Sequence, residues 1–174
     1  TFMDADSYQA CELCPRRCKA RRASDCAGFC GMTSELRVAR SALHFWEEPP
    51  ISGEAGSGAI FFSGCPLRCV FCQNHEISGE GFGLPVTRSR LSEMMLELEA
   101  QGALNINLVT ALHYAPDVRQ AVFDARAAGL TLPIVCNTSG YENPEVIRAM
   151  ADVVDVWLPD FKYADPTLAG SLSA

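Results

Sequence analysis

Three cysteines on one short segment, Cys65, Cys69 and Cys72, are the residues of this chain best suited to chemistry. Their spacing is C-x3-C-x2-C, and they closely follow the apolar run 59–62. Thiolates at this spacing suit three corners of a cubane iron–sulfur cluster, in which one iron then has no protein ligand and can bind a small chelating molecule. Zinc is a poorer match, because structural zinc sites use C-x2-C pairs and four ligands.

A second group of cysteines precedes this one. Cys11, Cys14, Cys18 and Cys30 supply four thiolates, the number that tetrahedral zinc or a second iron–sulfur cluster requires, and the sequence leaves both open. Cys26 is the extra cysteine, although it could replace Cys30. Either metal would stabilise the cysteine-rich segment 1–57, where apolar periodicity is weak.

Strand and helix patterns alternate after residue 57. Segments rich in apolar residues predict strands over residues 59–63, 104–110, 132–136 and 153–158. Amphipathic segments predict helices over 88–101, from Pro116 to Gly129, and from Pro144 to Met150 with Asn143 as N-cap. This alternation predicts an α/β fold with parallel strands and right-handed crossovers.

Polar residues follow the predicted strands, and the carboxyl ends of parallel strands meet on one face, where barrel enzymes have their sites. The candidates are Thr110, His113, Asn137, Thr138, Ser139, Asp160 and Lys162. Asp160 and Lys162 are two apart and point the same way, so they can form an active-site pair or a surface salt bridge. The segment 137–140 suits either ligand contacts or a turn, and His113 suits either catalysis or a structural role.

The cysteine segment, with Phe71 before its last cysteine, resembles the signature of the radical S-adenosylmethionine (radical SAM) superfamily. Segments 45–53, 137–142 and 158–163 extend the resemblance to proteins described as pyruvate formate-lyase activating enzymes. The resemblance implies a [4Fe-4S] cluster whose open iron binds S-adenosylmethionine, and reductive cleavage to methionine and a 5'-deoxyadenosyl radical that abstracts hydrogen. The most specific interpretation is activation of a glycyl-radical enzyme. The alternatives are another radical SAM reaction on a small molecule, peptide or RNA, or a non-catalytic iron–sulfur or zinc module.

The resemblance also implies roles for the candidate residues. Phe71 would pack near the adenine. Thr110 and His113 stand where many members have a Gly-Gly-Glu element, which this chain lacks. Segment 137–139 would contact the ribose or the carboxylate of the cofactor, and the Asp-x-Lys pair at 160–162 would lie in the active site.

The implied fold is a partial (β/α) barrel over residues 58–174, preceded by the cysteine-rich segment 1–57. The superfamily barrel has about six β/α units, whereas about four are visible here. We therefore expect the chain to be a fragment, the product of a truncated gene, or a part that another chain completes.

Composition bounds the partners and the compartment. The net charge of −7, with 14 Lys and Arg against 21 Asp and Glu, argues against nucleic acid as partner. No apolar run approaches the ~20 residues that span a bilayer. The nine cysteines are odd in number and clustered, which favours metal binding in a reducing, cytoplasmic setting over a disulfide framework. The basic run at 16–22 offsets thiolate charge, docks an acidic electron donor such as flavodoxin or ferredoxin, or forms a solvated loop.

Overall fold

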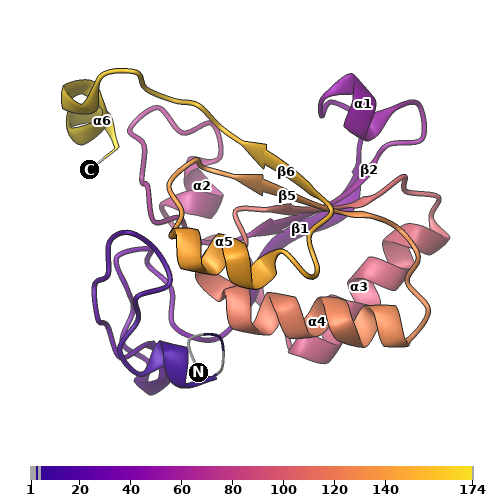
Figure 1. Cartoon of the computed structure of the whole chain (residues 1–174), viewed down its shortest axis with the longest axis horizontal. Coiled ribbons are helices and arrows are strands. Elements are labelled where there is room, and N and C mark those ends of the chain that lie inside the picture. Colours follow the sequence, from indigo (N-terminus) through magenta and orange to yellow (C-terminus); the bar gives the residue numbers. More distant parts are fainter. Residues whose placement is uncertain (1–2, 4, 174) are drawn as a thin grey trace.

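One mixed six-stranded sheet organises the chain in the computed structural model, which describes residues 3 and 5–173 (Figure 1). The strand order is β3-β1-β2-β4-β5-β6. Strands β2, β4, β5 and β6 are parallel, whereas β1 and β3 pair antiparallel at one side. The bounds are β1 (Arg37–His44), β2 (Ser57–Phe62), β3 (Leu84–Pro85), β4 (Ile106–Val109), β5 (Ile134–Thr138) and β6 (Val156–Pro159).

Three helices connect the parallel strands and cover one face of the sheet (Figure 1). They are α3 (Arg88–Ala100), α4 (Ala115–Ala127) and α5 (Pro144–Met150). The shorter elements are α1 (Pro49–Ser52), α2 (His75–Ser78), α6 (Pro166–Leu172) and the 3-10 turns η1 (Ala5–Tyr8), η2 (Arg22–Ser24) and η3 (Leu112–Tyr114). Within residues 3 and 5–173, no helix has both the length and the apolar character needed to cross a membrane.

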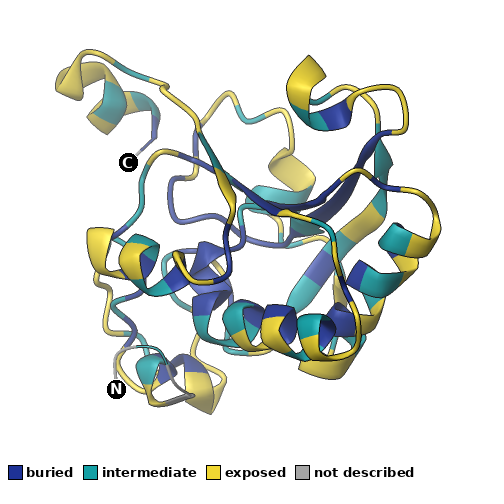
Figure 2. Ribbon diagram, turned by 45° about the vertical axis from the view of Figure 1, so that its right-hand side comes forward, coloured by how far each residue is buried: buried dark blue, intermediate teal, exposed yellow. Residues whose placement is uncertain are grey.

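Side chains alternate between the two faces of the parallel strands, as the two-residue period of a strand requires. Ile60, Leu108 and Cys136 lie in the hydrophobic core shared with the helices, and the central strands are among the most buried parts of the chain (Figure 2). Phe61 and Asn137 are each one position further along their strands, so their side chains lie on the other face of the sheet, where they line a pocket. The sheet therefore separates a dry core from a solvent-accessible site.

The four predicted strands after residue 57 and the three predicted helices are confirmed, and no end is shifted by more than three residues. Strand β1 was not predicted: its exposed Arg40 and Ser41 interrupt the alternation that marks a strand. The N-cap role of Asn143 needs a correction. Asn143 does precede α5, but its side chain caps no helix N–H, and its Nδ2 donates instead to the Glu12 carbonyl at 2.6 Å.

Candidate active site

A pocket of about 490 Å³ lies at the carboxyl ends of the parallel strands, and all three signature cysteines line it. Cys65 and Cys69 are buried and Cys72 is half-buried. The volume lies within the usual range of small-molecule sites. The pocket also receives Phe71, which is half-exposed and packs edge-on against Tyr163 with ring centroids 6.1 Å apart.

The backbone around the first cysteine holds the cluster loop in place. Gly64 has φ +81°, and a Cβ there would lie 2.7 Å from the Cys30 carbonyl oxygen. Only glycine combines this conformation with such a close approach. The Leu67 N–H donates to Cys65 Sγ at 3.4 Å, and Ser78 Oγ donates to Cys72 Sγ at 3.1 Å. These donors suit sulfur atoms that carry negative charge when they bind a metal.

The donors in the pocket test whether a cluster fits. Structural zinc takes four protein ligands, whereas a cubane held by three thiolates leaves one iron open to a ligand in the pocket. Cys65, Cys69 and Cys72 line one pocket together with polar side chains from the strand ends. This set of donors therefore fits an iron–sulfur cluster with one open iron.

Thr110 follows β4 at the pocket wall in a strained conformation. Its φ is +56°, which is rare for a β-branched residue. Its N–H donates to the Asn137 carbonyl at 3.0 Å, which ties the ends of β4 and β5 together. Such strain in a pocket wall is typical of functional sites.

The end of β5 supplies a row of polar side chains to the same pocket. Asn137, Thr138 and Ser139 all line it, as the sequence predicted for a shared strand-end face. Ser139 Oγ donates to Glu142 Oε1 at 3.0 Å, and burial raises the pKa of Glu142. The hydroxyl of Ser139 thus already has an internal acceptor, while the site stays rich in hydrogen-bonding groups.

Asp160 and Lys162 follow β6 and lie together in the pocket wall. Lys162 Nζ donates to Asp160 Oδ2 at 2.5 Å. Partial burial lowers the pKa of Lys162, but the hydrogen bond and charge of Asp160, with the nearby Cys69 and Cys65, raise it overall. The pair therefore presents an ammonium group and a carboxylate to whatever the pocket holds.

His113 does not line this pocket, contrary to its expected place facing the cofactor. It is buried, and its Nε2 lies 2.8 Å from the Ser63 carbonyl oxygen, in donor geometry for one tautomer. Burial lowers the pKa of His113 to about 3, with the nearby Arg22 charge acting the same way. A neutral imidazole that holds Ser63, next to the cluster loop, points to a positioning role.

Glu47 is a pocket residue to which the sequence analysis assigned no role. Its Oε2 accepts hydrogen bonds from Asn107 Nδ2 at 2.7 Å and Asn137 Nδ2 at 3.2 Å. Two amides thus hold a carboxylate at the pocket wall. Its presence in the segment 45–53 that resembles activating enzymes was the available signal.

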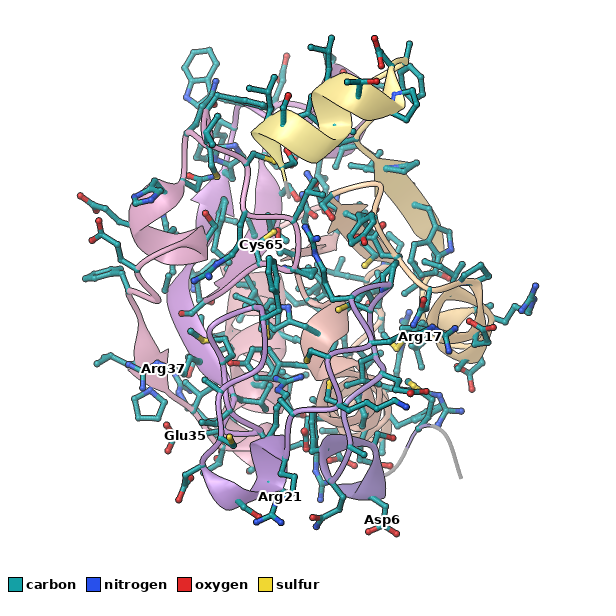
Figure 3. The ribbon with its side chains drawn as sticks, turned by 90° about the vertical axis from the view of Figure 1, so that its left-hand side faces the viewer. Asp6, Arg17, Arg21, Glu35, Arg37 and Cys65 are labelled. Carbon is teal, nitrogen blue, oxygen red and sulfur yellow. The ribbon has the colours of Figure 1, made fainter. Side chains whose placement is uncertain are left out.

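The N-terminal cysteines lie outside the large pocket but beside its loop. Arg16, between Cys14 and Cys18 in the sequence, donates through Nε to the Pro66 carbonyl at 3.0 Å and through Nη2 to the Ser173 carbonyl at 2.8 Å. Figure 3 shows the same neighbourhood, with Cys65 lying between the N-terminal loops and α6. The two cysteine groups are therefore joined by direct contacts.

Comparison with known proteins agrees with this geometry. The sequence profile of the radical SAM superfamily matches residues 59–169, more than half of the chain. An uncharacterized protein of Methanocaldococcus jannaschii is 28% identical over 173 residues, which cover 95% of this chain and 49% of that protein, so the chain spans about half of its length. No solved structure matches the chain. The profile match starts on the strand that leads into Cys65 and ends within α6, and the chain therefore belongs to the radical SAM superfamily.

Proposed function

We propose that this chain is an enzyme that starts a radical reaction with S-adenosylmethionine and a [4Fe-4S] cluster held by Cys65, Cys69 and Cys72. The observation that carries the proposal is that these three thiols line one pocket with polar residues from three successive strand ends. When bound, the cluster supplies the electron that splits S-adenosylmethionine into methionine and a 5'-deoxyadenosyl radical. The fold and the superfamily support this class of chemistry.

The residues of the pocket have distinct proposed tasks. Asn137, Thr138 and Thr110 offer hydrogen bonds to the ribose or to the amino and carboxylate groups of the cofactor. Phe71 gives the adenine an aromatic neighbour at the pocket mouth. Ser139, already bonded to Glu142, fixes the turn that follows β5.

Asp160 and Lys162 are the proposed catalytic pair. The raised pKa of Lys162 keeps its ammonium group charged, so it can pair with a carboxylate of cofactor or substrate. Asp160 holds that ammonium in place at 2.5 Å. His113 acts through the Ser63 carbonyl and positions the cluster loop.

The finer proposal is that the radical activates a glycyl-radical enzyme by taking hydrogen from one of its glycines. It rests on the resemblance of segments 45–53, 137–142 and 158–163 to activating enzymes. Phe71 in the pocket lining and the exposed Phe161, between Asp160 and Lys162 in the sequence, suit contact with a protein segment. Reduction would come from a one-electron carrier such as flavodoxin or ferredoxin.

The decisive test is anaerobic reconstitution of the chain with iron and sulfide, followed by reduction with S-adenosylmethionine and measurement of 5'-deoxyadenosine. We expect product from the unchanged chain and from Cys26→Ala, an exposed cysteine outside the pocket. Replacing Cys65, Cys69 and Cys72 by alanine should abolish it. Absence of product from a reconstituted, reduced chain would leave a non-catalytic iron–sulfur module as the better interpretation.

The substrate is tested separately, with a candidate glycyl-radical enzyme in the same mixture. A glycyl radical seen by electron paramagnetic resonance would support activation. Deoxyadenosine formed without any glycyl radical would favour a small molecule, a peptide or RNA as the acceptor.

A further inference from the structure

We propose that Cys11, Cys14, Cys18 and Cys30 bind a second iron–sulfur cluster, and that Arg22 is its buried counter-charge. The site lies outside the pocket described above and does not depend on the radical reaction.

Gly28 marks the place where the sulfur atoms approach one another. A Cβ at Gly28 would lie 3.5 Å from both Cys18 Sγ and Cys30 Sγ, and 3.4 Å from Arg22 Cδ. Cys11 Sγ lies 3.5 Å from Nη1 of the same arginine, and the Arg17 N–H donates to the Cys14 carbonyl at 3.0 Å, which turns the chain between Cys14 and Cys18. Two thiols and an arginine stem therefore face the space that the missing side chain of Gly28 leaves open.

The structure also separates the two candidates for the fourth ligand. Cys30 is buried, and its sulfur faces Gly28. Cys26 is exposed, and its sulfur is not among the three atoms nearest to the Cβ position of Gly28. The fourth ligand is thus Cys30.

Arg22 gives independent evidence for an anion at this place. It is 1% exposed, and its guanidinium donates to the carbonyl oxygens of Met32, Thr33 and His113 and to Cys11 Sγ, the last at 3.5 Å. In the part of the chain that the structure describes, none of these partners is a carboxylate. A buried positive charge without a negative partner is costly. Metal-bound thiolates would supply the missing negative charge.

The spacing of the cysteines selects a cluster over a single ion. Cys11, Cys14 and Cys18 lie close together in the sequence at C-x2-C-x3-C, and Cys30 follows at a distance. Three close cysteines and one distant cysteine are a known arrangement of iron–sulfur ligands, as in the plant-type C-x4-C-x2-C…C spacing, whereas structural zinc sites combine two close pairs of ligands. A cluster spreads the thiolates over several irons, and hydrogen bonds to its sulfurs, such as that from Arg22, set its potential.

The second cluster would also brace the loop of the first. The Cys30 carbonyl packs against Gly64, which directly precedes Cys65. Arg22 Nη1 donates to the His113 carbonyl at 2.6 Å, and the His113 ring meets the Ser63 carbonyl at 2.8 Å. Ordering the N-terminal cysteines thus orders the residues on which the first loop rests.

The first experiment measures the second site alone, in the chain with Cys65, Cys69 and Cys72 replaced by alanine. After anaerobic reconstitution we expect roughly four irons and four sulfides per chain. Adding Cys18→Ala should remove most of this iron and sulfide, whereas Cys26→Ala should not. Both cysteines are exposed, so neither change disturbs a packed core. Bound zinc without iron, or equal loss in both variants, would overturn the proposal.

The second experiment tests the counter-charge. Arg22→Gln keeps donors near Cys11 but removes the charge, so the reduction potential of the second cluster should shift to a more negative value. Arg21→Gln is the matched control, because Arg21 is exposed and points away from the fold (Figure 3). An unchanged potential in a folded, iron-loaded Arg22→Gln protein would contradict the assigned role. If that variant does not fold, the Cys18 and Cys26 pair decides the outcome.

Discussion

Gly64→Ala should destabilise the chain more than the same exchange at Gly102, a glycine with positive φ whose Cβ position is open. A Cβ at Gly64 would lie 2.3 Å from Met32 Cγ and 2.7 Å from the Cys30 carbonyl oxygen. The methionine side chain can move, but the carbonyl belongs to the backbone. The cluster loop and the N-terminal segment would therefore have to separate.

Two costs make up the expected loss of stability. Alanine in the left-handed region costs about 1–2 kcal/mol, and overpacking at a fixed contact adds about 1–3 kcal/mol. Gly102→Ala is the matched control: Gly102 has φ +89°, and nothing lies within 4 Å of its Cβ position. It should show the first cost alone, about 1–2 kcal/mol.

Anaerobic urea unfolding of both metal-free variants, followed by circular dichroism, measures the difference. Iron and sulfide content after reconstitution gives a second measurement, because displacement of Gly64 also displaces Cys65. We expect the Gly64 variant to be less stable than the Gly102 variant by at least about 1 kcal/mol and to bind less iron. Equal stabilities would refute the close approach of Cys30 and Gly64.

Three other predictions concern charges of the site. Glu47→Gln should weaken binding of S-adenosylmethionine or substrate by about 10- to 100-fold, because a charge-assisted contact is lost. The control Glu48→Gln changes an exposed neighbour and should leave the affinity unchanged. Equilibrium binding measurements on the two variants check this. Burial lowers the pKa of His113 to about 3, so below about pH 6.5 the unfolded chain binds a proton that the folded chain does not. The free energy of unfolding should therefore fall by about 2 kcal/mol between about pH 7 and about pH 5. Urea titrations at the two pH values should show that His113→Gln removes this pH-dependent loss of stability. Lys162→Met should abolish deoxyadenosine formation at unchanged iron content.

The repeating part of the fold was predictable because its signals are local. The segment 104–110 alternates apolar residues with Asn105 and Asn107, the segment 132–136 is mostly apolar, and the helix at 88–101 has an apolar stripe. Parallel pairing then follows from alternation of strands and helices. That the side chains of Asn137, Asp160 and Lys162 share one pocket also follows, because the carboxyl ends of parallel strands meet.

Features that depend on distant contacts were not predictable. Strand β1 takes its place through pairing with β2 and β3, and its own pattern is irregular. Glu47 reaches the pocket through amides that are 60 and 90 residues away. For His113 the sequence predicted a place in the pocket that the structure does not show. His113 follows a strand end, as the pocket residues do, but it lies in the turn η3 and is buried in the interior.

The basic run at 16–22 shows why composition alone left three interpretations open. Arg17 and Lys19 both have positive φ, so the backbone turns sharply and adjacent basic residues face different surroundings. Arg16 and Arg22 point inward: Arg16 joins its segment to the Pro66 carbonyl of the cluster loop, and Arg22 donates to the His113 carbonyl. Arg17 and Lys19 form exposed ion pairs with Glu12, which contribute little to stability.

The interpretations therefore apply to different residues of one run. Arg22 matches the counter-charge, because it is buried and contacts Cys11 Sγ. Arg17, Lys19 and Arg21 keep their charges at the surface, where an acidic electron donor could reach them. The sequence shows only a row of basic residues, and the fold decides which of them is buried beside Cys11 and which remain at the surface.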